Sequence, residues 1–332
     1  MTQPFPLRRL KLNRLAGTLL SAVVLLGVAA TAQAQNYPNK PIRLVVPFPA
    51  GSATDSMART LAAAVSTSLG QTILVENKAG ADGMIAASEV MRATPDGYTL
   101  LMATNSPMAG GPALRKSPPY DPVTDFTPIT DIGRYTFFLI AHPGVPANNL
   151  GELIQYAKAN PGKLNYATGN TTGIVTIAQL AGLTGMQMVH VPYKGEPQAL
   201  TDLIAGRVQL MVSAAGVAVP HVKEGRLKAI AVTLPKRSPV LPNVPTIAES
   251  GVPKFSLTSW AALFGPAKMP REVVDRLNKE FIAAMTKPEV ASTMEKQAFE
   301  LVGSTPEKLA VWVKDQYESY KSVLKAAGVE PE

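Results

Sequence analysis

The chain contains no cysteine among its 332 residues and only three histidines. The lack of cysteine excludes disulfides, thiolate metal sites, Fe–S clusters and cysteine nucleophiles. Because three histidines leave little for a metal site, we expect neither a metal nor a cofactor. Charged residues are also few, at 17%, whereas 46% of residues are apolar. The chain can therefore build hydrophobic cores, which excludes disorder and collagen-like repeats, and its length predicts two domains.

The first 34 residues have the pattern of a secretory signal peptide. Four basic residues lie between positions 8 and 14, an apolar stretch runs from Leu15 to Ala30, and Ala-Gln-Ala follows at 32–34. A membrane anchor is the alternative, but it needs about 20 strongly apolar residues. Charge, short apolar run and small-x-small site in this order predict export with cleavage after Ala34.

Cleavage at that point removes four basic residues and lowers the net charge from +8 to +4. The remaining sequence shows no basic helix face and no interleaving of basic with aromatic residues. We therefore expect no nucleic-acid partner. No later apolar run is long enough to span a membrane.

After the leader, short apolar strands alternate with helices that show a 3.6-residue periodicity. This pattern predicts right-handed crossovers and parallel strands. The strands expected in the first series are 42–47, 71–76 and 98–103, with helices at 54–69 and 82–92. A proline-rich stretch at 107–128 interrupts the pattern.

A second series follows the interruption. Its expected strands are 136–141, 164–167, 188–191, 208–212 and 227–232, and its expected helices are 150–159, 174–183, 197–205 and a short one around Val219. Another proline-rich stretch leads to a strand at 259–264 and to helices at 270–285 and 306–327. We expect an α/β protein with two lobes and a cleft: lobe 1 comprises residues 35–136 and 264–332, and lobe 2 residues 137–263.

Two turns rich in Gly, Ser and Thr follow strands at matching places in the two series. They span Phe48 to Asp55 and Thr168 to Gly173. Ligands collect at the carboxyl ends of parallel strands, and the N–H groups of a helix start favour anions. Ordinary helix capping explains each turn taken singly. Taken as a pair, the turns predict a clamp that holds a carboxylate from both lobes.

The sequence shows no convincing catalytic motif. The segment from Gly169 to Gly173 has the spacing of a nucleophile elbow, with Thr171 in place of serine, but spacing alone supplies neither the histidine nor the acid. Phe48, Tyr193 and Trp260 are candidate pocket walls, although aromatic residues more often fill cores.

Several motifs of the chain after residue 36 resemble one known family. They are Tyr37-Pro-x-Lys-Pro-Ile-Arg-Leu-Val-Val-Pro-Phe48, Ala50-Gly-x-x-x-Asp55, Val75-Glu-Asn-Lys-Ala-Gly80, Pro95-Asp-Gly-Tyr-Thr-Leu-Leu101 and His190-Val-Pro-Tyr-Lys-Gly195. Together they resemble the Bug family, the periplasmic substrate-binding receptors of tripartite tricarboxylate transporters.

The resemblance implies a type II periplasmic-binding-protein fold with mixed, mostly parallel sheets and a cleft that closes on a small carboxylate. It also implies a periplasmic, non-enzymatic monomer that delivers its ligand to a membrane permease of two subunits. The ligand contacts that it implies are Phe48, Ala50, Gly51, Ser52, Asp55, Thr104, Asn105, Thr168, Gly169, Asn170, Thr171, Ser213 and Ala214.

The chain departs from the family pattern at three places. Ser52 stands where a second glycine is usual, and Ile174-Val175-Thr176 replaces a His-Leu pair. The family often has a more polar side chain at or after the strand end where this chain has Ser213. A less polar second lobe would suit a ligand with an apolar or aromatic body, and a dicarboxylate also fits the family. Two other functions remain open: a sensor module for a membrane signalling partner, and an exported hydrolase that uses Thr171.

Overall fold

The computed structural model describes residues 37–255 and 257–331. The chain falls into two units, residues 1–39 and residues 40–332. In the first unit the described residues, 37–39, contain no helix or strand. The expected signal peptide at 1–34 lies outside the described residues. The fold described below is that of the second unit.

The first sheet combines the predicted parallel strands with three antiparallel ones. Its strand order is β11-β4-β10-β3-β1-β2. β1 pairs in parallel with β2 and β3, as the alternation of strands and helices predicts. β10, β4 and β11 extend the sheet in antiparallel pairings. The strands are β1 (Ile42–Val46), β2 (Ile73–Asn77), β3 (Thr99–Thr104), β4 (Phe126–Tyr135), β10 (Ser259–Pro266) and β11 (Phe299–Leu301).

The second sheet follows β4 directly in the chain, with Thr136 as the residue between β4 and β5. Its order is β7-β6-β8-β5-β9. β6 is parallel to β7 and β8, whereas β5 is antiparallel to β8 and β9. The strands are β5 (Phe137–Ala141), β6 (Asn165–Thr168), β7 (Val189–Pro192), β8 (Leu210–Ala214) and β9 (Lys228–Val232).

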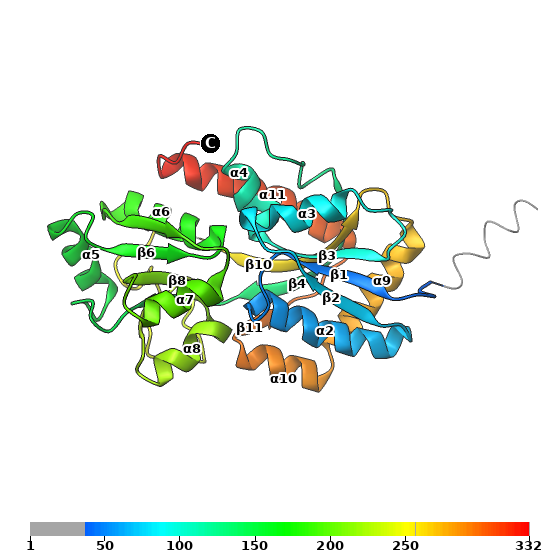
Figure 1. The fold of residues 1–332 in the computed structure, drawn as a ribbon, viewed down its shortest axis with the longest axis horizontal. Coiled ribbons are helices and arrows are strands. Elements are labelled where there is room, and N and C mark those ends of the chain that lie inside the picture. The colour runs from blue at the N-terminus through cyan, green and yellow to red at the C-terminus, as the bar shows by residue number, and fades with distance from the viewer. Residues whose placement is uncertain (1–36, 256, 332) are drawn as a thin grey trace, which may run out of the picture. The chain divides into compact units, whose positions relative to one another are not determined.

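Helices accompany both sheets, and Figure 1 shows the second sheet and its helices in green beside the blue and orange elements of the first. The first sheet carries α2 (Ala53–Leu69), α3 (Met84–Met91), α9 (Arg271–Met285), α10 (Pro288–Lys296) and α11 (Pro306–Ala326), with short turns η2 (Ala81–Gly83), η3 (Ser106–Gly110) and α4 (Gly111–Ala113). The second sheet carries α5 (Leu150–Ala159), α6 (Thr171–Thr184), α7 (Glu196–Ile204) and α8 (Ala215–Lys223).

The mixed α/β class with two sheets is confirmed. Among the described residues, four of the nine strand pairings are parallel, fewer than expected. Three antiparallel pairings involve β10, β4 and β11 in the first sheet, and two join β5 to β8 and β9 in the second. β10 pairs along its whole length within the first sheet. The lobe boundary expected between residues 263 and 264 therefore falls inside a strand.

Five elements of the described residues were not predicted: β4, α10, β11 and the short η3 and α4. β4 contains Pro128, and proline normally argues against an inner strand because it cannot donate to the ladder. The pairing with β10 shifts register at this point, from Leu263 opposite Thr130 to Phe264 opposite Pro128. The bulge lets an inner strand contain proline, and the bulge can be recognised only from the pairing of β4 with β10.

Each sheet has its own hydrophobic core. In the first, side chains of β1, β3 and β10 pack with α3 and α11, and Trp260 at the centre is fully buried. In the second, β5, β6 and β8 pack with α7 and α8. Trp260 is therefore a core residue and not a pocket wall, and replacing such a residue by alanine typically costs 3–5 kcal/mol.

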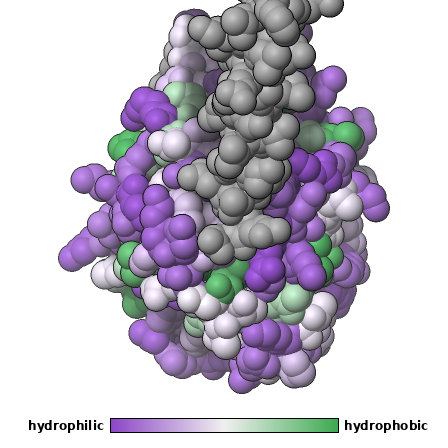
Figure 2. All heavy atoms as spheres, turned by 90° about the vertical axis from the view of Figure 1, so that its right-hand side faces the viewer, coloured by the Kyte–Doolittle hydropathy of each residue, from purple (hydrophilic) through white to green (hydrophobic). Residues whose placement is uncertain are grey.

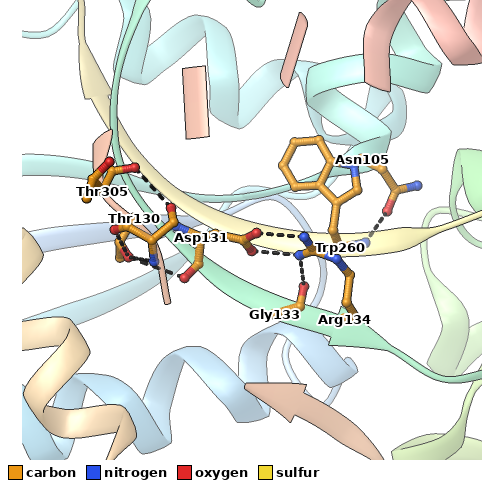
Figure 3. A network of polar contacts seen from close by, with 8 residues as sticks. Asn105, Thr130, Asp131, Gly133, Arg134, Trp260 and Thr305 are labelled. Carbon is orange, nitrogen blue, oxygen red and sulfur yellow. Dashed lines mark hydrogen bonds and ion pairs between the residues drawn. The ribbon is translucent and has the colours of Figure 1, made fainter. Parts of the chain in front are cut away.

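An ion pair holds the end of β4 just before the chain enters the second sheet. Both terminal nitrogens of Arg134 donate to the carboxylate oxygens of Asp131 at 2.7 Å, and one also donates to the Gly133 carbonyl (Figure 3). The guanidinium lies 4.3 Å from the Trp312 ring centroid.

The face of the molecule shown in Figure 2 is mostly hydrophilic outside the grey atoms, with scattered apolar residues.

Candidate ligand-binding site

A pocket lies where the carboxyl ends of strands from both sheets meet the first turns of helices. From the first sheet's side come residues after β1, the end of β3 with the two residues after it, and the end of β4. From the second come residues of β5, α7 and β8 and the start of α6 with its N-cap. The lining residues are Phe48, Ser52, Ala53, Thr54, Thr104, Asn105, Ser106, Tyr135, Phe137, Asn170, Thr172, Glu196 and Ala214.

The first turn of α2 supplies hydrogen-bond donors to this pocket. Ser52 caps the helix, since its hydroxyl accepts from the Asp55 N–H at 3.2 Å. Ala53 and Thr54 follow the cap and line the pocket. Their N–H groups have no intrahelical acceptor, and the helix dipole makes this end positive. The turn can therefore hold an anion without a basic side chain.

Asp55 does not line the pocket, and its carboxylate instead holds the turn before α2 through hydrogen bonds. Its carboxylate accepts from the Gly51 N–H at 3.0 Å, from Arg59 at 3.0 Å and from Asn77 at 2.9 Å. Burial opposes ionisation, but the hydrogen bonds from Arg59, Gly51 and Asn77 prevail and lower the pKa of Asp55. Gly51 has φ +80°, which favours glycine in the turn that Asp55 fixes.

Asn105, at the end of β3, connects the two sides of the pocket. Its amide nitrogen donates to Thr172 Oγ1 and to the Tyr320 hydroxyl, both at 2.7 Å. Its side-chain oxygen accepts a hydrogen bond from the backbone N–H of Trp260 at 3.2 Å (Figure 3). Ser106 adds a second link, because its hydroxyl accepts from the Thr171 N–H at 3.2 Å.

Tyr135 and Glu196 are the titratable groups of the pocket lining. The Tyr135 hydroxyl lies 2.9 Å from Thr54 Oγ1, and burial raises the pKa of this phenol well above its usual value. Glu196 is the first residue of α7 and is only 6% exposed. Its carboxylate accepts from Asn170 at 2.7 Å and from Ser213 and the Ala214 N–H at 3.3 Å each.

The structure brings six of the expected contact residues to the pocket: Phe48, Ser52, Thr104, Asn105, Asn170 and Ala214. The others lie around it. Ala50 is exposed, Asp55 holds Gly51, and Ser213 bonds Glu196. Thr168 Oγ1 lies 2.6 Å from His190 Nε2. Tyr193, an expected pocket wall, donates to Asp202 and lies in a neighbouring groove with Gly169.

Thr171 is fully buried, and its hydroxyl has no hydrogen-bond partner among the described residues. A threonine nucleophile needs a base within hydrogen-bond distance. The contact that the hydrolase hypothesis requires is thus missing from the described part of the chain.

Three more lining residues, Ala53, Thr54 and Thr172, lie within the two turns that the sequence predicts as a clamp. Four lining residues were not predicted: Ser106, Tyr135, Phe137 and Glu196. Ser106 directly follows the expected contact residue Asn105. Glu196 opens a helix just after a strand, so the rule that selected the two Gly-rich turns also applies to it. Tyr135 and Phe137 flank the passage between the sheets and carry no local sequence signal.

The sequence profile described as "Tripartite tricarboxylate transporter family receptor" matches residues 57–329. The chain belongs to this receptor family. The receptor is 32% identical to protein BugT of Bordetella pertussis over 324 residues, which is 96% of this chain and 99% of BugT.

Two solved structures also resemble this receptor. An R. palustris protein solved with adipate is 34% identical, with a TM-score of 0.86 over 89% of this chain and all of that one. MatC from Rhodopseudomonas palustris with bound malate is 31% identical, with a TM-score of 0.83 over 87% of this chain and all of MatC. The fold is that of periplasmic binding proteins of this type, as the motifs of the sequence indicate.

Two further observations concern the described residues only. No helix there is long and apolar enough to cross a membrane. No group of three or more His, Asp or Glu side chains there is placed to hold a metal ion.

Proposed function

We propose that this receptor is exported to the periplasm, binds a small organic carboxylate in the pocket, and delivers it to the two-subunit permease of a tripartite tricarboxylate transporter. The family description and the adipate and malate of its solved relatives support this proposal. The expected leader at residues 1–34 supports export.

The observation that carries the proposal is the arrangement of donors around the pocket. Among the described residues that line the pocket there is no Lys, Arg or His, yet the lining includes the first turns of α2 and α6. Backbone N–H groups and hydroxyls bind a carboxylate without a counter-ion side chain. Since these donors come from both sides of the pocket, a ligand that contacts both favours a closed arrangement of the two lobes.

Thermal unfolding of the purified protein against a panel of carboxylates tests the binding step. The panel spans aliphatic mono- and dicarboxylates, hydroxy and amino acids, and aromatic carboxylates. A ligand at about one hundred times its dissociation constant adds about 2.7 kcal/mol to the free energy of unfolding. One responding class supports the proposal, and a flat response across the panel contradicts it.

Delivery to a permease needs a separate measurement. Deletion of the gene abolishes uptake of the responding ligand if the protein serves a transporter. If uptake persists while ligand-dependent gene induction is lost, the protein serves a signalling partner instead.

A further inference from the structure

Glu196 places a buried carboxylate in the wall of the pocket. It is 6% exposed, and Asn170, Ser213 and the Ala214 N–H all donate to it. An ionised carboxylate offers about four lone-pair positions. Oε2 accepts two hydrogen bonds and Oε1 accepts one, so one position on Oε1 remains for a donor.

No basic side chain among the described residues pairs with Glu196, and none lines the pocket. The titratable group that faces it is Tyr135, which burial keeps protonated. Burial opposes the ionised form of Glu196 and raises its pKa to about 7, against the hydrogen bonds from Ala214, Asn170 and Ser213. The buried carboxylate thus has hydrogen-bond donors but no counter-ion.

A second carboxylate beside Glu196 would place two like charges in a desolvated pocket, with no basic side chain to separate them. A protonated amine instead supplies both the missing charge and a donor for the open position on Oε1. The hydrogen bonds from Asn170, Ser213 and Ala214 also suit an ionised carboxylate better than a neutral carboxylic acid, because the acid's own proton occupies one of the accepting positions.

We propose that Glu196 selects a ligand with two different ends: a carboxylate for the first turn of α2 and a cationic amino group for Glu196. This inference rests on the proposed function, and it narrows the substrate class to amino carboxylates. The opposing outcome is that the protein binds a dicarboxylate and that Glu196 takes up a proton when this ligand binds.

Calorimetric titration of the purified protein tests the proposal with matched ligands. The probes are straight-chain dicarboxylates and the ω-amino carboxylates of equal chain length, together with α-amino acids. In the wild-type protein we expect an amino carboxylate to bind at least about tenfold more tightly than its dicarboxylate partner.

The variant Glu196→Gln keeps the size of the side chain and removes its charge. We expect affinity for the amino carboxylate to fall about tenfold or more and the preference over the dicarboxylate to disappear. Glu289→Gln, at an exposed position on α10, is the matched control and keeps the wild-type preference. Because glutamine leaves one of the existing donors unpaired, thermal unfolding first verifies that Glu196→Gln folds. If the variant does not fold, the comparison of matched ligands on the wild-type protein still tests the inference.

A wild-type protein that prefers dicarboxylates, or a Glu196→Gln variant that keeps the amino preference, overturns the inference and leaves the proposed function intact. If neither ligand series binds the wild-type protein, the proposed function fails together with the inference.

Discussion

The amide nitrogen of Asn105 lies 2.7 Å from the hydroxyl oxygen of Thr172, although 67 residues separate them in the chain. Asn105 follows β3 of the first sheet, and Thr172 lies in the first turn of α6, which follows β6 of the second. The hydrogen bond is buried and lies at the pocket wall. It therefore connects the two sides on which the proposed closure depends.

We expect Thr172→Val to weaken ligand binding about five- to tenfold, because it removes the acceptor of a buried hydrogen bond worth roughly 1 kcal/mol. Thr171→Val is the matched control, since the Thr171 hydroxyl has no hydrogen-bond partner among the described residues. Removing that hydroxyl leaves affinity unchanged and does not lower stability. Calorimetry measures the ligand affinity of both variants, and an equal loss of affinity in the two would contradict this role of Thr172.

The raised pKa of Glu196 predicts a pH-dependent stability. The folded protein has a pKa of about 7 at this group, against 4.5 for the ordinary value. Between these values the folded state binds more protons than the unfolded state, so stability falls as pH rises. The contribution is fully present below pH 4.5 and lost above about pH 7.

Urea unfolding of the wild-type protein and Glu196→Gln across this range measures that contribution. Relative to the variant, the wild-type protein should lose about 3 kcal/mol of unfolding free energy as pH rises from about 4.5 to about 8. A difference between the two proteins that stays constant with pH would show that Glu196 does not titrate in this range.

Gly169 is required by the backbone of α7. A Cβ atom there would lie 2.4 Å from the Glu196 N atom and 2.4 Å from the Gly195 carbonyl carbon. We therefore expect Gly169→Ala to displace the start of α7, to lower stability by about 1–3 kcal/mol, and to weaken binding. Gly151→Ala, within α5, is the control and should be neutral or slightly stabilising, because alanine favours helices. Denaturant unfolding and calorimetry distinguish the two; an unperturbed Gly169→Ala would refute the clash.

Asp55 positions the α2 turn through the Gly51 N–H, Arg59 and Asn77. We expect Asp55→Asn to cost about 1–3 kcal/mol of stability and to weaken ligand binding, since three partly buried donors lose a charged acceptor. Asp275→Asn removes an exposed i,i+4 pair with Arg271 and should cost less than about 0.5 kcal/mol. Similar losses in both variants, measured by denaturant unfolding, would argue against a special role for Asp55.

The local pattern of the sequence predicted most helices and strands of the fold. The α5 range Leu150–Ala159 agrees with the expected helix, because Asn149 caps it and Asn160-Pro-Gly ends it. Capping and turn residues act within a few positions, so they are readable without the rest of the chain. The turn at α2 was predicted in the same way, and Ser52 and Phe48 lie in the pocket.

Interactions between distant segments could not be read in this way. Pro128 lies in a strand only because a bulge opposite Phe264 accommodates it. Asp55 looked like a contact residue, but the approach of Asn77 and Gly51 makes it a support for the turn. Thr171 and Thr172 are adjacent and alike in sequence, yet only Thr172 meets Asn105.

Sequence patterns alone were sufficient to predict the α/β class, the family resemblance and the two Gly-rich turns that border the pocket. These depend on periodicity, capping and short motifs, all of which are local properties of the chain. The folded chain was needed to show which residues line the pocket and that Glu196 is buried among Asn170, Ser213 and Ala214. Burial and hydrogen bonding at that carboxylate arise from residues 17 to 26 positions away in sequence, and its charge state depends on them.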